Sequence, residues 1–85
     1  MVISLYPNPA ELETMISHEA RVGQQVRIDL IDMEGKMISK IFDGTINSIN
    51  DRFNQIDISL LPEGIYFIRT QIDMQINFQK LAVIR

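Results

Sequence analysis

Leu61-Pro62-Glu63-Gly64-Ile65-Tyr66-Phe67-Ile68-Arg69-Thr70-Gln71-Ile72 decides the fold, because it joins a tight turn to the most strand-like run in the chain. Pro62 presets the φ angle that the second residue of a turn needs, and Gly64 can adopt a positive φ that residues with a Cβ resist. After the turn, apolar residues alternate with mixed ones, which is the two-residue period of a half-buried β-strand. The stretch predicts a corner that leads into a long strand.

Outward from this stretch, short alternating runs recur between glycine, proline, asparagine and aspartate residues, a pattern typical of antiparallel strands joined by tight turns. We expect turns at Asp32-Met33-Glu34-Gly35-Lys36, which closes a hairpin, at Asp43-Gly44 and at Asp73-Met74. A helical turn is the alternative to a strand at residues 12–16. The expected strands are residues 2–5, 12–16, 25–32, 37–42, 45–49 (a weak strand or edge segment), 56–60, 65–72 and 75–84.

The first turn contains two prolines, and the last expected strand contains a change in its apolar period. Tyr6-Pro7-Asn8-Pro9-Ala10 ends a short first strand, because its two prolines remove two backbone donors and exclude a helix. In the last strand, the apolar residues change phase between Phe78 and Leu81. This shift around Gln79-Lys80 predicts a β-bulge.

Seven or eight short strands with turn signals at this spacing predict an all-β fold, an immunoglobulin-like antiparallel β-sandwich of about seven strands. Tyr66 follows Gly64 by two residues, where such sandwiches often carry a tyrosine that hydrogen-bonds to the backbone just upstream. No stretch keeps a helical period, and the sequence has no internal repeat or linker. Residues 1–85 are therefore expected to form one trimmed module.

The composition limits the function. The chain has 85 residues, a net charge of -3 and scattered basic residues, which is the wrong charge pattern for binding nucleic acid. It has no cysteine, so disulfides and thiolate metal sites are excluded. A hydrophobic fraction of 46% without tryptophan indicates a small aliphatic core with a narrow stability margin. No apolar run is long enough to span a membrane, and residues 1–6 lack the pattern of a signal peptide.

One histidine and one set of acidic residues are of types that can bind a metal ion or take part in catalysis. His18 is the only histidine and lies in a polar stretch, residues 17–23, so we expect a loop residue rather than a ligand or base. Asp29, Asp32 and Glu34 resemble a fragment of a calcium loop, but the remaining oxygen ligands are missing at the required spacing. An acidic hairpin is the preferred interpretation, and neither a cofactor nor an enzymatic activity is expected.

Four segments occur together in order and spacing: residues 5–10, 32–36, 61–66 and 80–83. Together they resemble the type A C-terminal sorting domain of the type IX secretion system of Gram-negative bacteria. No motif is specific alone, so the resemblance rests on the four in register, over essentially the whole chain. Arg85 departs from the pattern as a charged end, and so does Met1, directly before the first strand.

The resemblance implies that residues 1–85 are a single C-terminal sorting domain, an immunoglobulin-like sandwich excised from a larger secreted precursor. Such a domain directs an upstream cargo through an outer-membrane translocon. The resemblance also implies transit through the periplasm, removal by a sortase-like peptidase, and attachment of the cargo to lipopolysaccharide at the cell surface. The implied partners are the translocon, the peptidase and the cargo domain, and a dimer through an exposed edge strand is left open. The motif positions carried over are Pro7, Asn8, Pro9, Gly35, Lys36, Gly64, Tyr66, Lys80 and Val83.

These positions also have structural explanations. Pro7 and Pro9 can stiffen the chain and cap an edge, or contact the export machinery. Gly35 and Gly64 are expected to serve turns with positive φ. Lys80 can protect an edge against aggregation, or be read by a partner that adds a strand.

The alternative function is an accessory immunoglobulin-like binding or adhesion module of an extracellular multidomain protein. Carbohydrate-binding surfaces usually expose aromatic side chains, and this chain offers two tyrosines and no tryptophan. Position in the precursor discriminates the two functions, because a sorting domain must come last.

Overall fold

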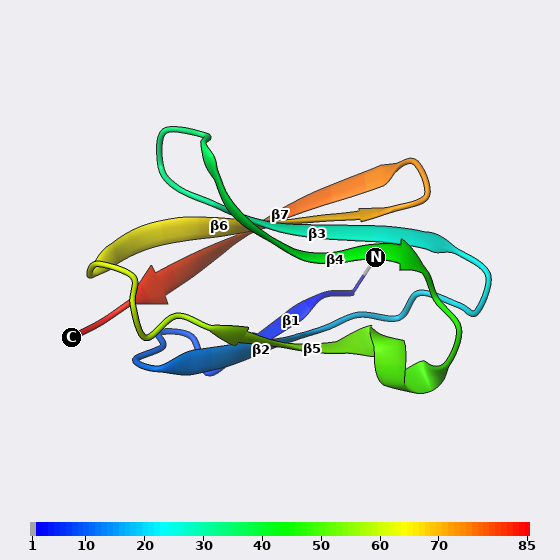
Figure 1. Ribbon diagram of the computed structural model, residues 1–85, viewed down its shortest axis with the longest axis horizontal. Helices are drawn as coiled ribbons and strands as arrows, with labels where there is room; N and C mark the ends of the chain where they lie inside the picture. Colours follow the sequence, from blue (N-terminus) through cyan, green and yellow to red (C-terminus); the bar gives the residue numbers. More distant parts are fainter. Residues whose placement is uncertain (1) are drawn as a thin grey trace.

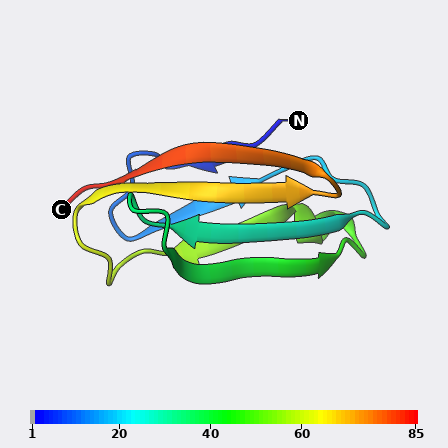
Figure 2. The same ribbon diagram turned by 90° about the horizontal axis from the view of Figure 1, so that it is seen from above.

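The computed structural model describes residues 2–85, which form a sandwich of two antiparallel sheets (Figure 1). The smaller sheet has the order β1-β2-β5 and the larger sheet the order β4-β3-β6-β7. In Figure 2 the four strands of the larger sheet lie side by side in front of the smaller sheet. The predicted all-β sandwich is confirmed. The elements are β1 (Ser4–Tyr6), β2 (Glu13–Ser17), β3 (Gln25–Ile31), β4 (Met37–Thr45), the 3₁₀ helix η1 (Ile49–Arg52), β5 (Phe53–Asp57), β6 (Gly64–Ile72) and β7 (Gln75–Val83).

The strand order differs in one strand from a constant-type immunoglobulin domain, whose fourth strand lies in the same sheet as the first, second and fifth. Here β4 pairs with β3 in the larger sheet instead. The hairpin between them is tight, because the Asp32 amide donates to the Lys36 carbonyl oxygen at 2.9 Å. A short hairpin keeps consecutive strands in one sheet.

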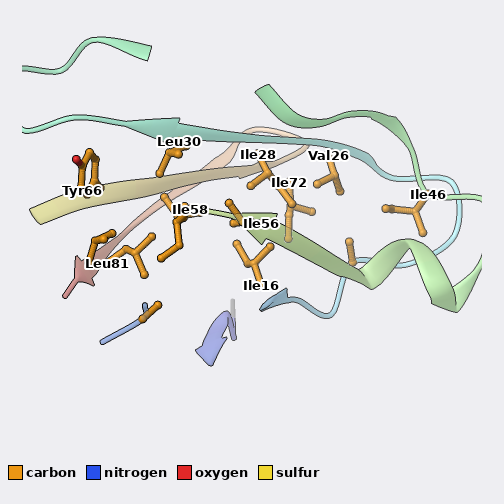
Figure 3. Close-up of a cluster of buried hydrophobic side chains, with 14 residues drawn as sticks. Ile16, Val26, Ile28, Leu30, Ile46, Ile56, Ile58, Tyr66, Ile72 and Leu81 are labelled. Atoms are coloured by element: carbon orange, nitrogen blue, oxygen red, sulfur yellow. The ribbon is translucent and has the colours of Figure 1, made fainter. Parts of the chain in front are cut away.

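The core lies between the sheets and is mainly aliphatic (Figure 3). Alternate residues of β6 are buried from Tyr66 to Ile72, as the two-residue period predicts. β3 contributes Val26, Ile28 and Leu30 from the same face of the larger sheet. The fully buried large side chains include Ile16, Ile28, Leu30, Ile46, Ile58, Ile68, Leu81 and Val83.

The region between β4 and β5 departs from the sequence predictions. The turn expected at Asp43-Gly44 is wrong, because both residues belong to β4 and pair with β3. The weak strand expected at residues 45–49 is also wrong, because β4 ends at Thr45 and η1 begins at Ile49. The Asp51 carboxylate accepts from the backbone amides of Asn47 and Ser48 at 2.8 and 3.2 Å, which favours a helical turn over extension. Within residues 2–85 no helix has the length and apolar character to cross a bilayer.

The strand expected at residues 56–60 is displaced towards the N-terminus, since β5 covers Phe53–Asp57. The Asp57 carboxylate accepts from both the amide and the hydroxyl of Ser59, at 2.9 and 2.7 Å, and this local turn ends the strand. Ile58 is still buried, but Leu60 is 96% exposed. The strand at residues 12–16 is confirmed as β2, so the helical alternative is wrong.

The β-bulge expected at Gln79-Lys80 is wrong. β6 and β7 pair residue by residue from Gly64 with Val83 to Ile72 with Gln75, without a register shift. The apolar residues change phase because Ile76 and Phe78 are exposed on the outer face of the sheet, whereas Leu81 and Val83 enter the core. The register shifts of the larger sheet lie between β3 and β4 instead.

Candidate recognition surface at the capped end of the sandwich

The corner before β6 has the geometry that the sequence predicts. The Tyr66 hydroxyl donates to the Pro62 carbonyl oxygen at 2.7 Å, and the ring is buried against the core. Gly64 has φ +154°, a backbone conformation that side chains with a Cβ rarely adopt. The predicted tyrosine corner is therefore confirmed, and it fixes the start of β6 where that strand meets the end of β7.

Asn8 connects the first turn to the outer edge of the last strand. Its side-chain Nδ2 donates to the Lys80 carbonyl oxygen at 2.8 Å, and its Oδ1 accepts from the Ala82 amide at 3.1 Å. A side-chain amide carries both a donor and an acceptor, so Asn8 occupies the place that a neighbouring strand would take. This half of the β7 edge is therefore covered by the chain itself.

The backbone after Asn8 continues this cap. The Ala10 amide donates to the Ala82 carbonyl at 2.8 Å, and the Ile84 amide donates to the Ala10 carbonyl at 2.9 Å. The Thr14 hydroxyl donates to the Pro7 carbonyl at 2.8 Å and holds the turn against β2. Pro7 and its neighbours are thus bound on two sides, to β2 and to β7.

Arg85 ties together the loops at the same end of the molecule. Its guanidinium donates to the carbonyl oxygens of Glu11, Ile58 and Leu61, the last two at 2.5 and 2.6 Å. Its backbone amide donates to the Glu63 carboxylate at 3.1 Å. The charged end that departs from the motif pattern therefore joins two loops that are distant in sequence.

We call this region the capped end: residues 7–12, 58–63 and 80–85, at the left of Figure 1. Apolar side chains are exposed around it, among them Tyr6, Leu12, Leu60 and Ile84. A shallow hollow is lined by Pro7, Pro9, Glu11, Leu12, Glu13 and Ile84. The capped end therefore combines apolar contact surface with carboxylates.

The hairpin with Gly35 and Lys36 lies at the same end of the larger sheet (Figure 1) but is a separate feature. Gly35 has φ +84°, as expected for its turn. The Asp32 carboxylate accepts from the amides of Glu34 and Lys36, both at 2.9 Å. Within residues 2–85, the hydrogen bonds of this turn stay inside the hairpin. The structure thus connects Pro7, Asn8, Pro9, Gly64, Tyr66, Lys80 and Val83 through β7, and leaves Gly35 and Lys36 apart.

A protein-family model described as the secretion system C-terminal sorting domain matches residues 4–84, which include all seven strands. The chain belongs to this family. Membership in this family makes the domain a non-catalytic C-terminal signal for type IX secretion, which interacts with that machinery. No curated protein sequence matches the chain. The protein that carries the domain is destined for the cell surface or the extracellular space.

His18 of the sorting domain lies in the loop that follows β2, as expected, but its side chain is buried. Its Nδ1 accepts from the Ala20 amide at 3.2 Å, and its backbone amide donates to the Arg52 carbonyl at 3.1 Å. Burial lowers the pKa of the imidazole, and the nearby Arg52 charge lowers it further. One signal was available in the sequence: the two-residue period of Thr14 and Ile16 continues through His18 and Ala20.

Asp29 is buried on the outer face of the larger sheet of the sorting domain. Its carboxylate lies 3.0 Å from Arg27 Nε and 3.6 Å from Arg69 Nη1. Asp32 and Glu34 lie beyond β3 in the hairpin, and within residues 2–85 no group of three or more acidic, histidine or cysteine side chains could hold a metal ion. Asp29 therefore pairs with two arginines, and Asp32 stabilises the hairpin turn.

Proposed function

We propose that the type IX outer-membrane translocon recognises this sorting domain as a folded object, and that the capped end is the surface it reads. The observation that carries the proposal is the contact of Asn8 with Lys80 and Ala82. It joins the first motif segment, residues 5–10, to the last, residues 80–83, across 72 and 74 positions of the sequence. Such a surface exists only when both sheets have formed, so an unfolded tail cannot present it.

The composition of the capped end supports a protein partner. Leu12 and Ile84 are exposed beside the carboxylate of Glu11 and the rigid prolines of the first turn. Exposed apolar groups with a polar rim are typical of protein–protein contact surfaces. Among the nine motif positions, Gly64 and Tyr66 build the corner, whereas Pro7, Pro9 and Lys80 are exposed and available for contact.

The finer steps of export form part of the same proposal. A longer precursor carries residues 1–85 as its single C-terminal sorting domain and crosses the periplasm before export. A sortase-like peptidase then cuts upstream of β1 and attaches the cargo to the cell surface. β1 runs towards the capped end, because Tyr6 leads directly into the first turn. The upstream chain therefore leaves in the direction away from the capped end (Figure 2), which would let the peptidase and the translocon act at different places.

The test is export of a fluorescent reporter fused upstream of the domain, in a host with a working type IX system and in its translocon-deficient mutant. Two matched substitutions then separate recognition from folding. Leu12→Lys alters an exposed side chain at the capped end (67% exposed), and Val22→Lys alters an equally exposed one at the opposite end (64%). We expect export of the wild-type and Val22→Lys fusions in the competent host only, and periplasmic retention of the Leu12→Lys fusion.

Circular dichroism melts of the purified variants control for folding, and we expect equal midpoints. Normal export of a folded Leu12→Lys fusion would show that the capped end is not read. Retention of the wild-type fusion in both hosts would contradict a sorting role for this chain, and an accessory binding module would then become the better hypothesis.

A further inference from the structure

Half of the outer edge of β7 has no cap. Asn8 bonds to the Lys80 carbonyl and the Ala82 amide, so these backbone groups point away from β6. Backbone groups of successive strand residues point to alternate sides, so those of Ile76 and Phe78 face the same outer edge. Within residues 2–85, nothing pairs with them there. Strand β7 is therefore covered along one half and open along the other.

We call residues 75–79, with the sequence Gln-Ile-Asn-Phe-Gln, the open edge. It carries no charge, proline or bulge, the devices by which proteins usually prevent strands from adding to an edge. The other edge strand of the same sheet has such devices, because β4 carries two register shifts and the Lys40–Asp43 ion pair. The open edge is therefore a site where another strand can add.

The side chains of the open edge also lack partners. On the outer face, Ile76 is 51% exposed and Phe78 is 61% exposed. On the opposite face, the side-chain oxygens of Asn77 and Gln79 are buried and accept no hydrogen bond within residues 2–85. A strand that fits this edge would offer backbone groups, apolar side chains on one face and amide donors on the other.

We propose that this strand is the open edge of a second copy of the chain, paired antiparallel about a two-fold axis through Asn77. The sequence Gln-Ile-Asn-Phe-Gln has the same polar and apolar pattern in both directions, so a two-fold contact places apolar side chains opposite apolar ones and amides opposite amides. Ile76 then lies opposite Phe78 of the second copy in a hydrogen-bonded pair, and Phe78 lies opposite its Ile76. Asn77 faces Asn77, and Gln75 faces Gln79. Their amides are both donors and acceptors, so they can satisfy the buried oxygens.

The length of the open edge fits this register. At one end β7 begins after the Asp73-Met74 turn, and at the other end Asn8 covers the strand from Lys80. In the proposed register, Lys80 of one copy lies opposite Met74 of the other, so each turn ends the pairing where the cap of the other copy begins. The two larger sheets become one continuous sheet. A five-residue contact is small, so the dimer is weak and depends on concentration.

The experiment is sedimentation velocity of the purified chain from about 10 µM to about 1 mM, the range in which weak complexes dissociate. I76K/F78K places two cations opposite each other in the proposed register, whereas I76K/F78E places a cation opposite an anion. Ile38→Lys is the matched control, since it changes an exposed isoleucine on β4, the other edge strand. All substituted positions are exposed, and thermal melts verify that each variant is folded.

We expect the wild type, Ile38→Lys and I76K/F78E to approach twice the monomer mass at the highest concentration, and I76K/F78K to stay monomeric. A wild type that is monomeric throughout would overturn the proposal and leave the edge for a different partner strand. Association of I76K/F78K as strong as that of the wild type would place the contact elsewhere. Loss of association in I76K/F78E would overturn the antiparallel register. None of these outcomes depends on whether the domain acts in sorting.

Discussion

The two halves of β7 belong to one continuous strand but are built differently. Residues 80–83 send Leu81 and Val83 into the core, and their outer edge is covered by Asn8 and Ala10. Residues 75–79 expose Ile76 and Phe78 and bury amide oxygens without partners. The pairing with β6 is regular along both halves, so the difference lies in side chains and in the cap. One half stabilises the sandwich, and the other leaves an edge available for contact.

Truncation of one large side chain in each half should separate them most strongly. Leu81→Ala removes a fully buried side chain, and we expect a loss of about 2–5 kcal/mol in the free energy of unfolding. Phe78→Ala removes a mostly exposed one, and we expect a change within about 0.5 kcal/mol. Urea denaturation of both variants measures the difference. Equal losses would show that the two halves contribute alike to stability.

Removal of the cap should have a smaller effect. Asn8→Ala deletes both hydrogen bonds to β7, and we expect a loss of about 1–3 kcal/mol, from about 0.5–1.5 kcal/mol for each bond. The matched change Asn47→Ala, at an exposed position at the opposite end, should leave the unfolding midpoint unchanged. Hydrogen exchange adds a local readout, since the Ala82 amide should lose protection first. Undiminished protection of that amide in Asn8→Ala would contradict the cap.

The smallest expected effect lies in the loop after β2, away from β7. The pKa of His18 is lowered in the folded state by burial and by Arg52, so the unfolded chain binds the proton more tightly. The contribution of His18 to the stability should therefore be constant above pH 6.5 and fall as the pH drops from 6.5 towards the lower folded pKa. His18→Asn keeps an acceptor for the Ala20 amide but does not titrate. Thermal melts across this range should show a shallower acid decline for His18→Asn, and parallel curves would exclude His18 as the cause.

Local signals in the sequence predicted those parts of the fold that depend on neighbouring residues. Pro62, Gly64 and Tyr66 indicated the corner, and Gly35 indicated the β3–β4 turn. The misplaced elements lie where a side chain bonds to the backbone a few residues away. Asp51 favours η1 over a strand, and Asp57 ends β5 before residue 58.

The sequence alone determined the all-β class, the corner and most strand positions, because two-residue periods and turn residues act locally. Its four motifs in register also indicated the sorting family. Only the tertiary structure decided that Asn8 covers the end of β7, that Arg85 bonds to the loops of Glu11 and Leu61, and that residues 75–79 stay open. The contact of Asn8 with Lys80 spans 72 positions, and no local pattern encodes which distant backbone groups meet. Such contacts depend on how the two sheets stack, which the whole chain settles together.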